Sequence, residues 1–116
     1  IIRTESELVQ ALTELDGFRE RVAKMSVAGG RAYNPGWNLA TDLPSMLAVT
    51  TLVTKGAIER RESRGGHTRD DYPKADPELG KVNMVQRLDG RGEYTLNPEP
   101  IPVMPDELQV LFEEGK

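Results

Sequence analysis

Two stretches of this chain carry apolar residues at intervals of three and four, the spacing that places side chains on one face of an α-helix. The pair Gly29-Gly30 and the polar stretch "RAYNPGWN" separate them. The pattern predicts one helix over about residues 4–25 and a second over about 38–62, with Asn38 as the cap of the second. Because only a short loop joins them, the two helices should pack antiparallel as a helical hairpin.

One face of each predicted helix should be buried against the other. Pro44 must then lie in the first turn of the second helix or kink it, because proline cannot donate the helical hydrogen bond. Gly29-Gly30 should end the first helix and Gly65-Gly66 the second. The side chains expected to face inward are Leu12, Leu15, Phe18, Val22, Leu47, Thr50, Val53 and Ala57.

The last third of the chain has a different pattern. The stretches "KVNMVQRL" and "EYTLN" flank "DGRG", and Asp-Gly between partly apolar segments is a β-hairpin signal. The stretch "NPEPIPV" should be extended, and "PDELQVLFEE" should form a short final helix that ends before Gly115. The predicted fold is therefore mainly α: a helical hairpin (residues 1–62), a charged loop (63–80), and a small β-hairpin with a C-terminal tail (81–116).

Composition narrows the class of protein. A chain of 116 residues makes one domain or part of one, and the missing initiating Met suggests a fragment. The net charge of −4 argues against binding a nucleic-acid backbone. The absence of cysteine excludes disulfides, thiolate metal sites and a thiol nucleophile. "DGRGEY" lacks the third glycine of a dinucleotide-binding motif.

Residues 60–73, "RRESRGGHTRDDYP", hold four arginines, three acids and the only histidine. His67 with Asp70 and Asp71 could ligate a metal, although the neighbouring arginines would oppose a cation. His67 could instead move protons beside Ser63 as a nucleophile, or Gly65-Gly66 with the arginines could bind an anion. Charges of both signs after a helix also form solvated, mutually paired loops or polar interfaces. The pattern alone leaves these alternatives open.

Residues 57–76, "AIERRESRGGHTRDDYPKAD", resemble the C-terminal signature of the flavoprotein subunits of succinate dehydrogenase and fumarate reductase, to which L-aspartate oxidase is related. The signature reads Ala-x-x-Arg-x-Glu-Ser-Arg-Gly-x-His-x-Arg-x-Asp-x-Pro. The resemblance extends to the preceding helix and the later "NMVQRLDGRGEYTL" hairpin. The matching residues are Ala57, Arg60, Glu62, Ser63, Arg64, Gly65, His67, Arg69, Asp71, Pro73 and Asp76.

The resemblance implies a larger parent with a flavin-binding domain, a capping domain and a helical C-terminal domain, part of a three-helix bundle, to which this chain corresponds. Such a parent interconverts succinate and fumarate with FAD and passes electrons to an iron–sulfur subunit and quinone. Membrane anchor subunits would hold it on the cytoplasmic face of a bacterial inner membrane. The family's catalytic and flavin-linked residues lie outside this sequence, so no catalytic, cofactor or metal residue is expected here, and His67 is not one of them.

The resemblance further implies that the signature docks this domain onto the rest of the parent. Its side chains should then be partly exposed here, since their partners would lie upstream. The apolar surface left bare should favour a homodimer of the isolated chain. The alternative is a free-standing helical module that binds an acidic partner through Arg64 and Arg69. The residues assigned to docking are Glu62, Ser63, Arg64, Gly65, His67, Arg69, Asp71 and Pro73.

Overall fold

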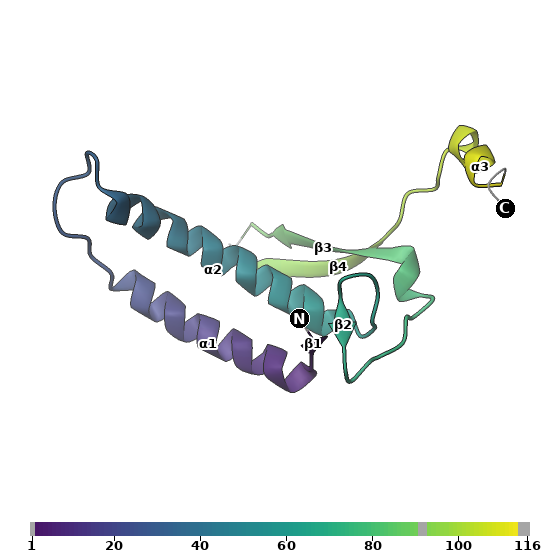
Figure 1. The fold of residues 1–116 in the computed structure, drawn as a ribbon, viewed down its shortest axis with the longest axis horizontal. Coiled ribbons are helices and arrows are strands. Elements are labelled where there is room, and N and C mark those ends of the chain that lie inside the picture. The colour runs from purple at the N-terminus through teal and green to yellow at the C-terminus, as the bar shows by residue number, and fades with distance from the viewer. Residues whose placement is uncertain (1, 91–92, 114–116) are drawn as a thin grey trace.

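The computed structural model describes residues 2–90 and 93–113 (Figure 1). Two long helices lie side by side and run antiparallel, and a β-hairpin packs beside the second of them. The predicted fold class is therefore confirmed. In chain order the elements are β1 (Ile2–Arg3), α1 (Glu5–Ala23), α2 (Pro35–Glu59), β2 (Thr68–Arg69), the 3-10 turn η1 (Leu79–Lys81), β3 (Val82–Leu88), β4 (Tyr94–Pro100) and α3 (Asp106–Glu113).

Helix α1 begins with a reciprocal cap. The Thr4 hydroxyl accepts a hydrogen bond from the Glu7 backbone N–H at 3.4 Å, and the Glu7 carboxylate accepts one from the Thr4 N–H at 3.1 Å. These bonds satisfy donors that the first helical turn leaves unpaired. The helix ends at Ala23, near the predicted end at about residue 25, but several residues before Gly29-Gly30, which therefore do not form its C-terminal cap.

Helix α2 begins earlier than its pattern suggested. Asn34, rather than Asn38, caps it, because its side-chain oxygen accepts from the Gly36 and Trp37 backbone N–H groups at 3.1 and 3.4 Å. Pro35 follows in the first turn, where a missing N–H costs nothing. Pro44 consequently lies inside the helix, not in its first turn, and α2 ends at Glu59 rather than near residue 62.

The interface between α1 and α2 is narrower than the two apolar stripes. Leu8 and Leu15 of α1 and Thr51, Thr54 and Ala57 of α2 are buried. The hydroxyls of Thr51 and Thr54 donate to backbone carbonyls four residues earlier, which lets them lie in this interface. Three side chains predicted to face inward do not, and among them Phe18 is 44% exposed and Val53 60% exposed. Thr50 is also exposed.

The segment after α2 folds back to the start of the chain. Strand β2 pairs in parallel with β1, in the register Ile2 with Thr68 and Arg3 with Arg69. The Asp70 N–H continues this pairing by donating to the Arg3 carbonyl at 3.0 Å. This pairing, which periodicity did not predict, places the charged loop against the N-terminus of α1 (Figure 1).

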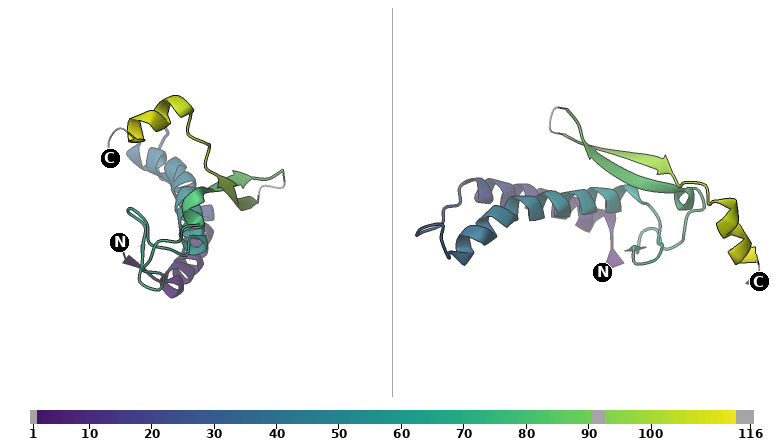
Figure 2. Two further views of the ribbon diagram at one scale, coloured as in Figure 1. Left: turned by 90° about the vertical axis from the view of Figure 1, so that its right-hand side faces the viewer. Right: turned by 90° about the horizontal axis from the view of Figure 1, so that it is seen from above.

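Strands β3 and β4 form the predicted antiparallel hairpin, from Val82 opposite Pro100 to Leu88 opposite Tyr94. The rest of the expected "DGRG" turn, residues 91–92, lies outside the described residues, as does Gly115 beyond the last helix. The Gln86 side chain donates to the Leu52 carbonyl at 2.7 Å and so ties β3 to α2. The right-hand view of Figure 2 shows α3 beyond the end of the β-hairpin.

Within the part of the chain that the structure describes, none of the helices combines the length and the apolar character needed to cross a membrane.

Candidate functional site: the signature loop

The signature loop, residues 63–80, begins with a tight reversal. Arg64 and His67 exchange two backbone hydrogen bonds, of 2.8 and 3.0 Å, across Gly65-Gly66. Gly65 adopts a φ of +57°, a left-handed conformation that glycine adopts at low cost. A Cβ added at Gly65 or Gly66 would meet no atom within 4 Å. The tip of the loop is therefore open to other surfaces.

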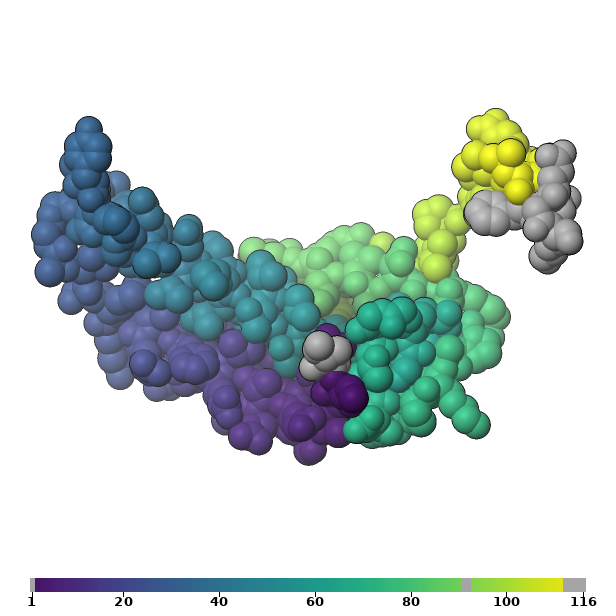
Figure 3. All heavy atoms as spheres, in the orientation of Figure 1, coloured from purple at the N-terminus to yellow at the C-terminus, as the bar shows by residue number. Residues whose placement is uncertain are grey.

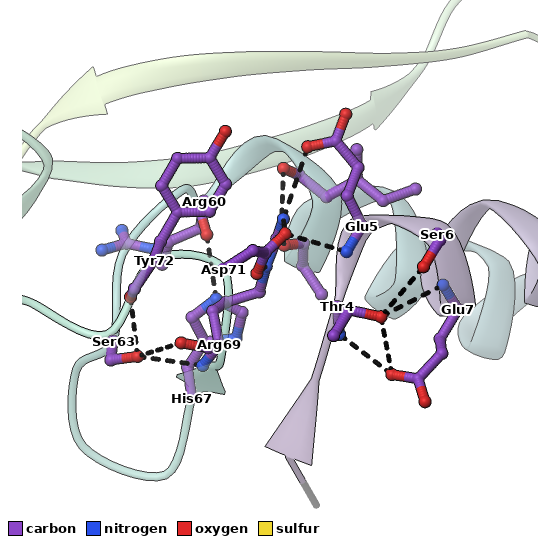
Figure 4. Close-up of polar contacts among 12 residues, drawn as sticks. Thr4, Glu5, Ser6, Glu7, Arg60, Ser63, His67, Arg69, Asp71 and Tyr72 are labelled. Atoms are coloured by element: carbon purple, nitrogen blue, oxygen red, sulfur yellow. Dashed lines mark hydrogen bonds and ion pairs between the residues drawn. The ribbon is translucent and has the colours of Figure 1, made fainter.

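Arg69 is the centre of the first ionic cluster, which we call the Arg69 cluster and which also contains Glu5 and Asp71 (Figure 4). The Arg69 side chain is completely buried. Its Nε and one terminal nitrogen donate to the two Asp71 carboxylate oxygens at 2.7 and 2.5 Å, and it reaches Glu5 at 3.4 Å. A planar guanidinium matches a carboxylate in this two-bond geometry.

Arg69 also donates hydrogen bonds to backbone carbonyls at the C-terminal end of α2. Its other terminal nitrogen donates to the carbonyls of Ala57 and Ile58, at 2.8 and 3.2 Å. Carbonyls in the last turn of a helix have no partner inside the helix, and a buried one must be satisfied from elsewhere. Tyr72 covers the guanidinium with its ring centroid at 4.9 Å. One side chain therefore joins the C-terminal end of α2 to the N-terminal end of α1.

Asp71 has two tasks in this cluster. Besides binding Arg69, its carboxylate accepts a hydrogen bond from the Glu5 backbone N–H, at 2.9 Å, in the first turn of α1. The hydrogen bonds from Arg69 lower the pKa of Asp71 well below its usual range, against the opposing effect of partial burial and with help from Glu5 N–H. Asp71 therefore stays charged at the positive end of α1.

Glu62 is the centre of a second set of ion pairs, which we call the Glu62 cluster. Its buried carboxylate accepts from Arg60 at 2.5 Å, from the Arg64 Nε at 3.1 Å and from the Asp76 backbone N–H at 2.8 Å. Burial alone would raise the pKa of Glu62, but the bonds from Arg64, Asp76 and Arg60 outweigh it, and the pKa is lowered. Arg60 further donates to the Val82 carbonyl at 2.9 Å, which links the cluster to β3.

Ser63 and His67 have separate structural partners. The Ser63 hydroxyl accepts from the Arg69 N–H at 2.9 Å and lies 2.9 Å from the Tyr72 carbonyl. His67 Nε2 donates to the Arg60 carbonyl at 2.9 Å (Figure 4). Its Nδ1 lies 3.4 Å from an Arg3 guanidinium nitrogen. Each side chain is thus bonded to loop backbone, and this geometry does not pair Ser63 with His67 as nucleophile and base.

A metal site also lacks support from the geometry. Asp71 is engaged by Arg69 and Glu5, and Asp70 pairs through its backbone with β1. Among the residues that the structure describes, no group of three or more His, Cys, Asp or Glu side chains is placed to hold a metal ion. The polar groups of the loop mainly form hydrogen bonds and ion pairs with one another and with the helix ends.

Two expectations about this site are corrected. Arg69 was expected to be partly exposed, and it is buried; Glu62 is buried as well. The partners of the signature's charged side chains were expected upstream, but Arg60, Arg64, Arg69 and Asp71 all have partners inside this chain. The reason is that the loop folds back on both helices, so opposite charges meet locally. Glu5 also belongs to this network, and nothing in the spacing of charges identified it. Asp76, which matched the signature, joins the network through its backbone N–H and carbonyl.

The lowered pKa values of Asp71 and Glu62 predict a loss of stability in acid. Between their ordinary and folded pKa values, the unfolded chain binds protons that the folded chain does not, so the free energy of unfolding falls as pH falls. The contribution is fully present above about pH 5 and decreases below about pH 4. Urea unfolding at pH 7 and pH 3 should show a clear loss, reduced in Asp71→Asn. An equal loss in that variant would contradict the role of Asp71.

Gly80 makes room for Arg64. A Cβ at Gly80 would lie 2.6 Å from an Arg64 guanidinium nitrogen that is held by Glu62 at 3.0 Å and by the Asp76 carbonyl at 2.8 Å. Gly80→Ala should therefore displace the guanidinium and lower the free energy of unfolding by about 1–2 kcal/mol. Gly66→Ala, which meets no neighbour, is the control for urea unfolding. Equal effects of the two substitutions would refute this account.

The chain belongs to the family described as "Fumarate reductase flavoprotein C-term", which it matches over residues 1–110. The resemblance seen in the signature is therefore confirmed. The match includes the two long helices, the signature loop and the β-hairpin.

The chain is also similar to individual flavoprotein subunits. Mycobacterium smegmatis Sdh1, solved in complex with UQ1, is 42% identical with a TM-score of 0.86, over 99% of this chain and 20% of that one. The fumarate reductase flavoprotein subunit of Mycobacterium tuberculosis is 32% identical over 89% of this chain and 18% of its own length. The succinate dehydrogenase flavoprotein subunit of Bacillus subtilis is 28% identical over 76% of this chain and 15% of its own length. The chain thus spans a fifth or less of these relatives.

Proposed function

We propose that this chain is the C-terminal helical domain of a larger flavoprotein subunit that interconverts succinate and fumarate. The observation that carries the proposal is the match of residues 1–110 to the C-terminal region of that family. Relatives carry the names of both fumarate reductase and succinate dehydrogenase flavoprotein subunits.

FAD would be held by other parts of that subunit. The described residues of this chain do not fit a flavin, because they form no strand–turn–helix unit with a glycine-rich phosphate loop. The sequence "DGRGEY" lacks the required third glycine. No redox step is therefore assigned to residues of this chain. In the whole assembly, electrons would pass to an iron–sulfur subunit and quinone, with anchor subunits at the cytoplasmic face of a bacterial membrane.

Within that subunit we assign two roles to the signature. The Arg69 and Glu62 clusters fix the two helices and the β-hairpin to one another, since each cluster joins at least two of these elements. The loop tip, residues 64–66, then docks on the flavin-bearing part of the subunit. Arg64 is 44% exposed, and both glycines offer their backbone to an approaching surface.

Docking through the loop tip predicts an effect that depends on context. Gly66→Trp should leave the unfolding of the 116-residue chain nearly unchanged, because the new side chain points into open space. In the full natural gene product it should lower the melting temperature by several degrees, because the bulky ring would separate two docked surfaces. Differential scanning calorimetry of both proteins makes the comparison. An unchanged melting temperature in the full product would remove the docking role.

The proposed function is tested on the full natural gene product. It should show flavin absorption near 450 nm, on the order of one flavin per chain, and should oxidise succinate or reduce fumarate with an artificial electron carrier. A colourless product without either activity would overturn the proposal.

The alternative of a free-standing module that binds an acidic partner through Arg64 and Arg69 has little support. Arg69 is buried and already bonded to Asp71 and Glu5, so it has no surface to offer.

A further inference from the structure

The last part of the chain forms an arm that leaves the body of the domain. We call residues 101–113 the C-terminal arm. It begins at Ile101, whose N–H donates to the Lys81 carbonyl at 3.0 Å, and it ends in helix α3. The space-filling view shows α3 standing clear of the rest of the molecule beyond the end of the β-hairpin (Figure 3), and the right-hand view of Figure 2 agrees.

The course of the arm is built into its sequence. Pro102 and Pro105 disfavour helical conformations at the residues before them, Ile101 and Met104, and so favour an extended course between the body and α3. The Pro105 carbonyl accepts from the Leu108 and Gln109 N–H groups at 2.9 and 3.2 Å, and the Gln109 side chain donates to the Met104 carbonyl at 3.1 Å. These local bonds fix the first turn of α3, and none of them joins α3 to the body of the domain.

The arm carries apolar side chains that water surrounds in this structure. Leu108 and Leu111 are three residues apart in α3, and so lie near one another on the helix surface. Val103 is 88% exposed and Leu111 65% exposed. An isolated helix of eight residues is marginal in water, so α3 needs an apolar surface for its stability. The other exposed apolar residues of the arm are Ile101, Met104 and Val110.

The charges of the arm are all of one sign. Asp106, Glu107 and Glu113 are its only ionisable residues. A surface that receives the arm must therefore combine an apolar floor with basic residues at its rim. The body has such a groove, lined by Phe18, Arg21, Val22, Met25, Ser26, Leu43 and Leu47. This groove lies at the other end of a molecule 63 Å long, out of reach of the arm of the same chain.

We propose that the C-terminal arm is a clamp that docks on the flavin-bearing, upstream part of the same polypeptide. This inference rests on the proposed function. Its support is the solved Sdh1 chain, where the match covers 99% of this chain, arm included, but only 20% of that polypeptide. Four-fifths of such a chain are thus available to cover an arm that the body of this domain leaves bare. The predicted contact is an apolar groove with lysine or arginine at its rim.

Photo-crosslinking of the full natural gene product tests the inference. The photoreactive amino acid p-benzoylphenylalanine replaces Leu111 in one protein. As a matched control it replaces Asp106 in a second protein, at the acidic edge of α3, where the rim and not the apolar floor is expected. We expect irradiation of the Leu111 protein to join α3 to a peptide upstream of this domain, without an increase in subunit mass on a denaturing gel. The Asp106 protein should give far less of this product.

Other outcomes would overturn the clamp. A crosslink to the groove of a second copy would make the arm a dimer contact, and one to a different subunit would make it a subunit contact. Equal crosslink yields from positions 111 and 106, or no crosslink from either, would mean that the arm does not dock on the upstream part of the polypeptide. Flavin absorption of the same samples separates the two proposals: a colourless protein contradicts the proposed function, whereas a flavin-bearing protein without the upstream crosslink contradicts only the clamp.

Discussion

Replacing Arg69 by methionine should lower the free energy of unfolding by about 2–4 kcal/mol. Methionine fills part of the space but cannot donate hydrogen bonds. The Ala57 and Ile58 carbonyls would lose their donor at the end of α2, and Asp71 and Glu5 would lose the cation between them. Urea unfolding followed by far-ultraviolet circular dichroism measures the change.

Arg61 supplies the control for this experiment, because it lies on the same segment and is exposed. Arg61→Ala should change the unfolding midpoint very little. Arg69→Lys should recover only a minor part of the loss, since an ammonium cannot reproduce the paired bonds to Asp71 and the bonds to the helix carbonyls at once. Full recovery by lysine would show that charge alone matters, and would contradict the geometric role.

Glu62→Ala should have the other large effect, a loss of about 3–5 kcal/mol. The substitution leaves Arg60 and Arg64 without their shared acceptor and leaves the Asp76 N–H without a partner in a partly buried position. Glu62→Gln should lose less, because one amide oxygen still accepts a hydrogen bond while the amide nitrogen opposes the arginines. Unfolding free energies from urea titrations at pH 7 give this order directly.

Glu59 is the matched control for Glu62. It is exposed at the end of α2, where a negative charge is unfavourable to the helix dipole. Glu59→Ala should therefore cause no loss, or a slight gain. If Glu59→Ala and Glu62→Ala were equally destabilising, the Glu62 cluster could not be the source of the effect.

The two long helices could be predicted from sequence because their apolar periodicity is a local signal. Their ends could not all be predicted. Asn34 with Pro35 was available as a start signal, yet Asn38 has the same side chain and lies nearer the apolar run. The end of α2 depends on Arg69, which lies twelve residues beyond Ala57 in the chain and donates hydrogen bonds to the carbonyls of the last helical turn. That contact exists only after the loop has folded back.

The sequence pattern also predicted more buried residues between the two helices than the structure has. A helix in a two-helix hairpin buries a narrow strip, whereas the apolar stripes of this chain are wide enough for more than one neighbour. Phe18 and Val53 lie at the edges of those stripes and remain exposed. Periodicity gives the direction of an apolar face, but it does not say how many partners the face has.

The candidate site was located from sequence, but its internal organisation was not. The signature residues were recognised as one unit, and the loop does bring Glu62, Ser63, Arg64, His67, Arg69 and Asp71 together. Burial of Arg69 depends on the pairing of β1 with β2, two strands of two residues each, which are too short to produce a pattern. An arginine in sequence carries no mark that distinguishes a buried position from an exposed one.

The central claim is that the Arg69 cluster stabilises this domain from within, and does not depend on surfaces outside it. Arg69→Met is therefore compared in two proteins, the 116-residue chain and the full natural gene product, through the unfolding free energy of this domain in each. The account predicts equal losses in the two proteins, because the described partners of the Arg69 side chain lie within residues 5–72. A substantial loss in the full product with little change in the 116-residue chain would contradict it.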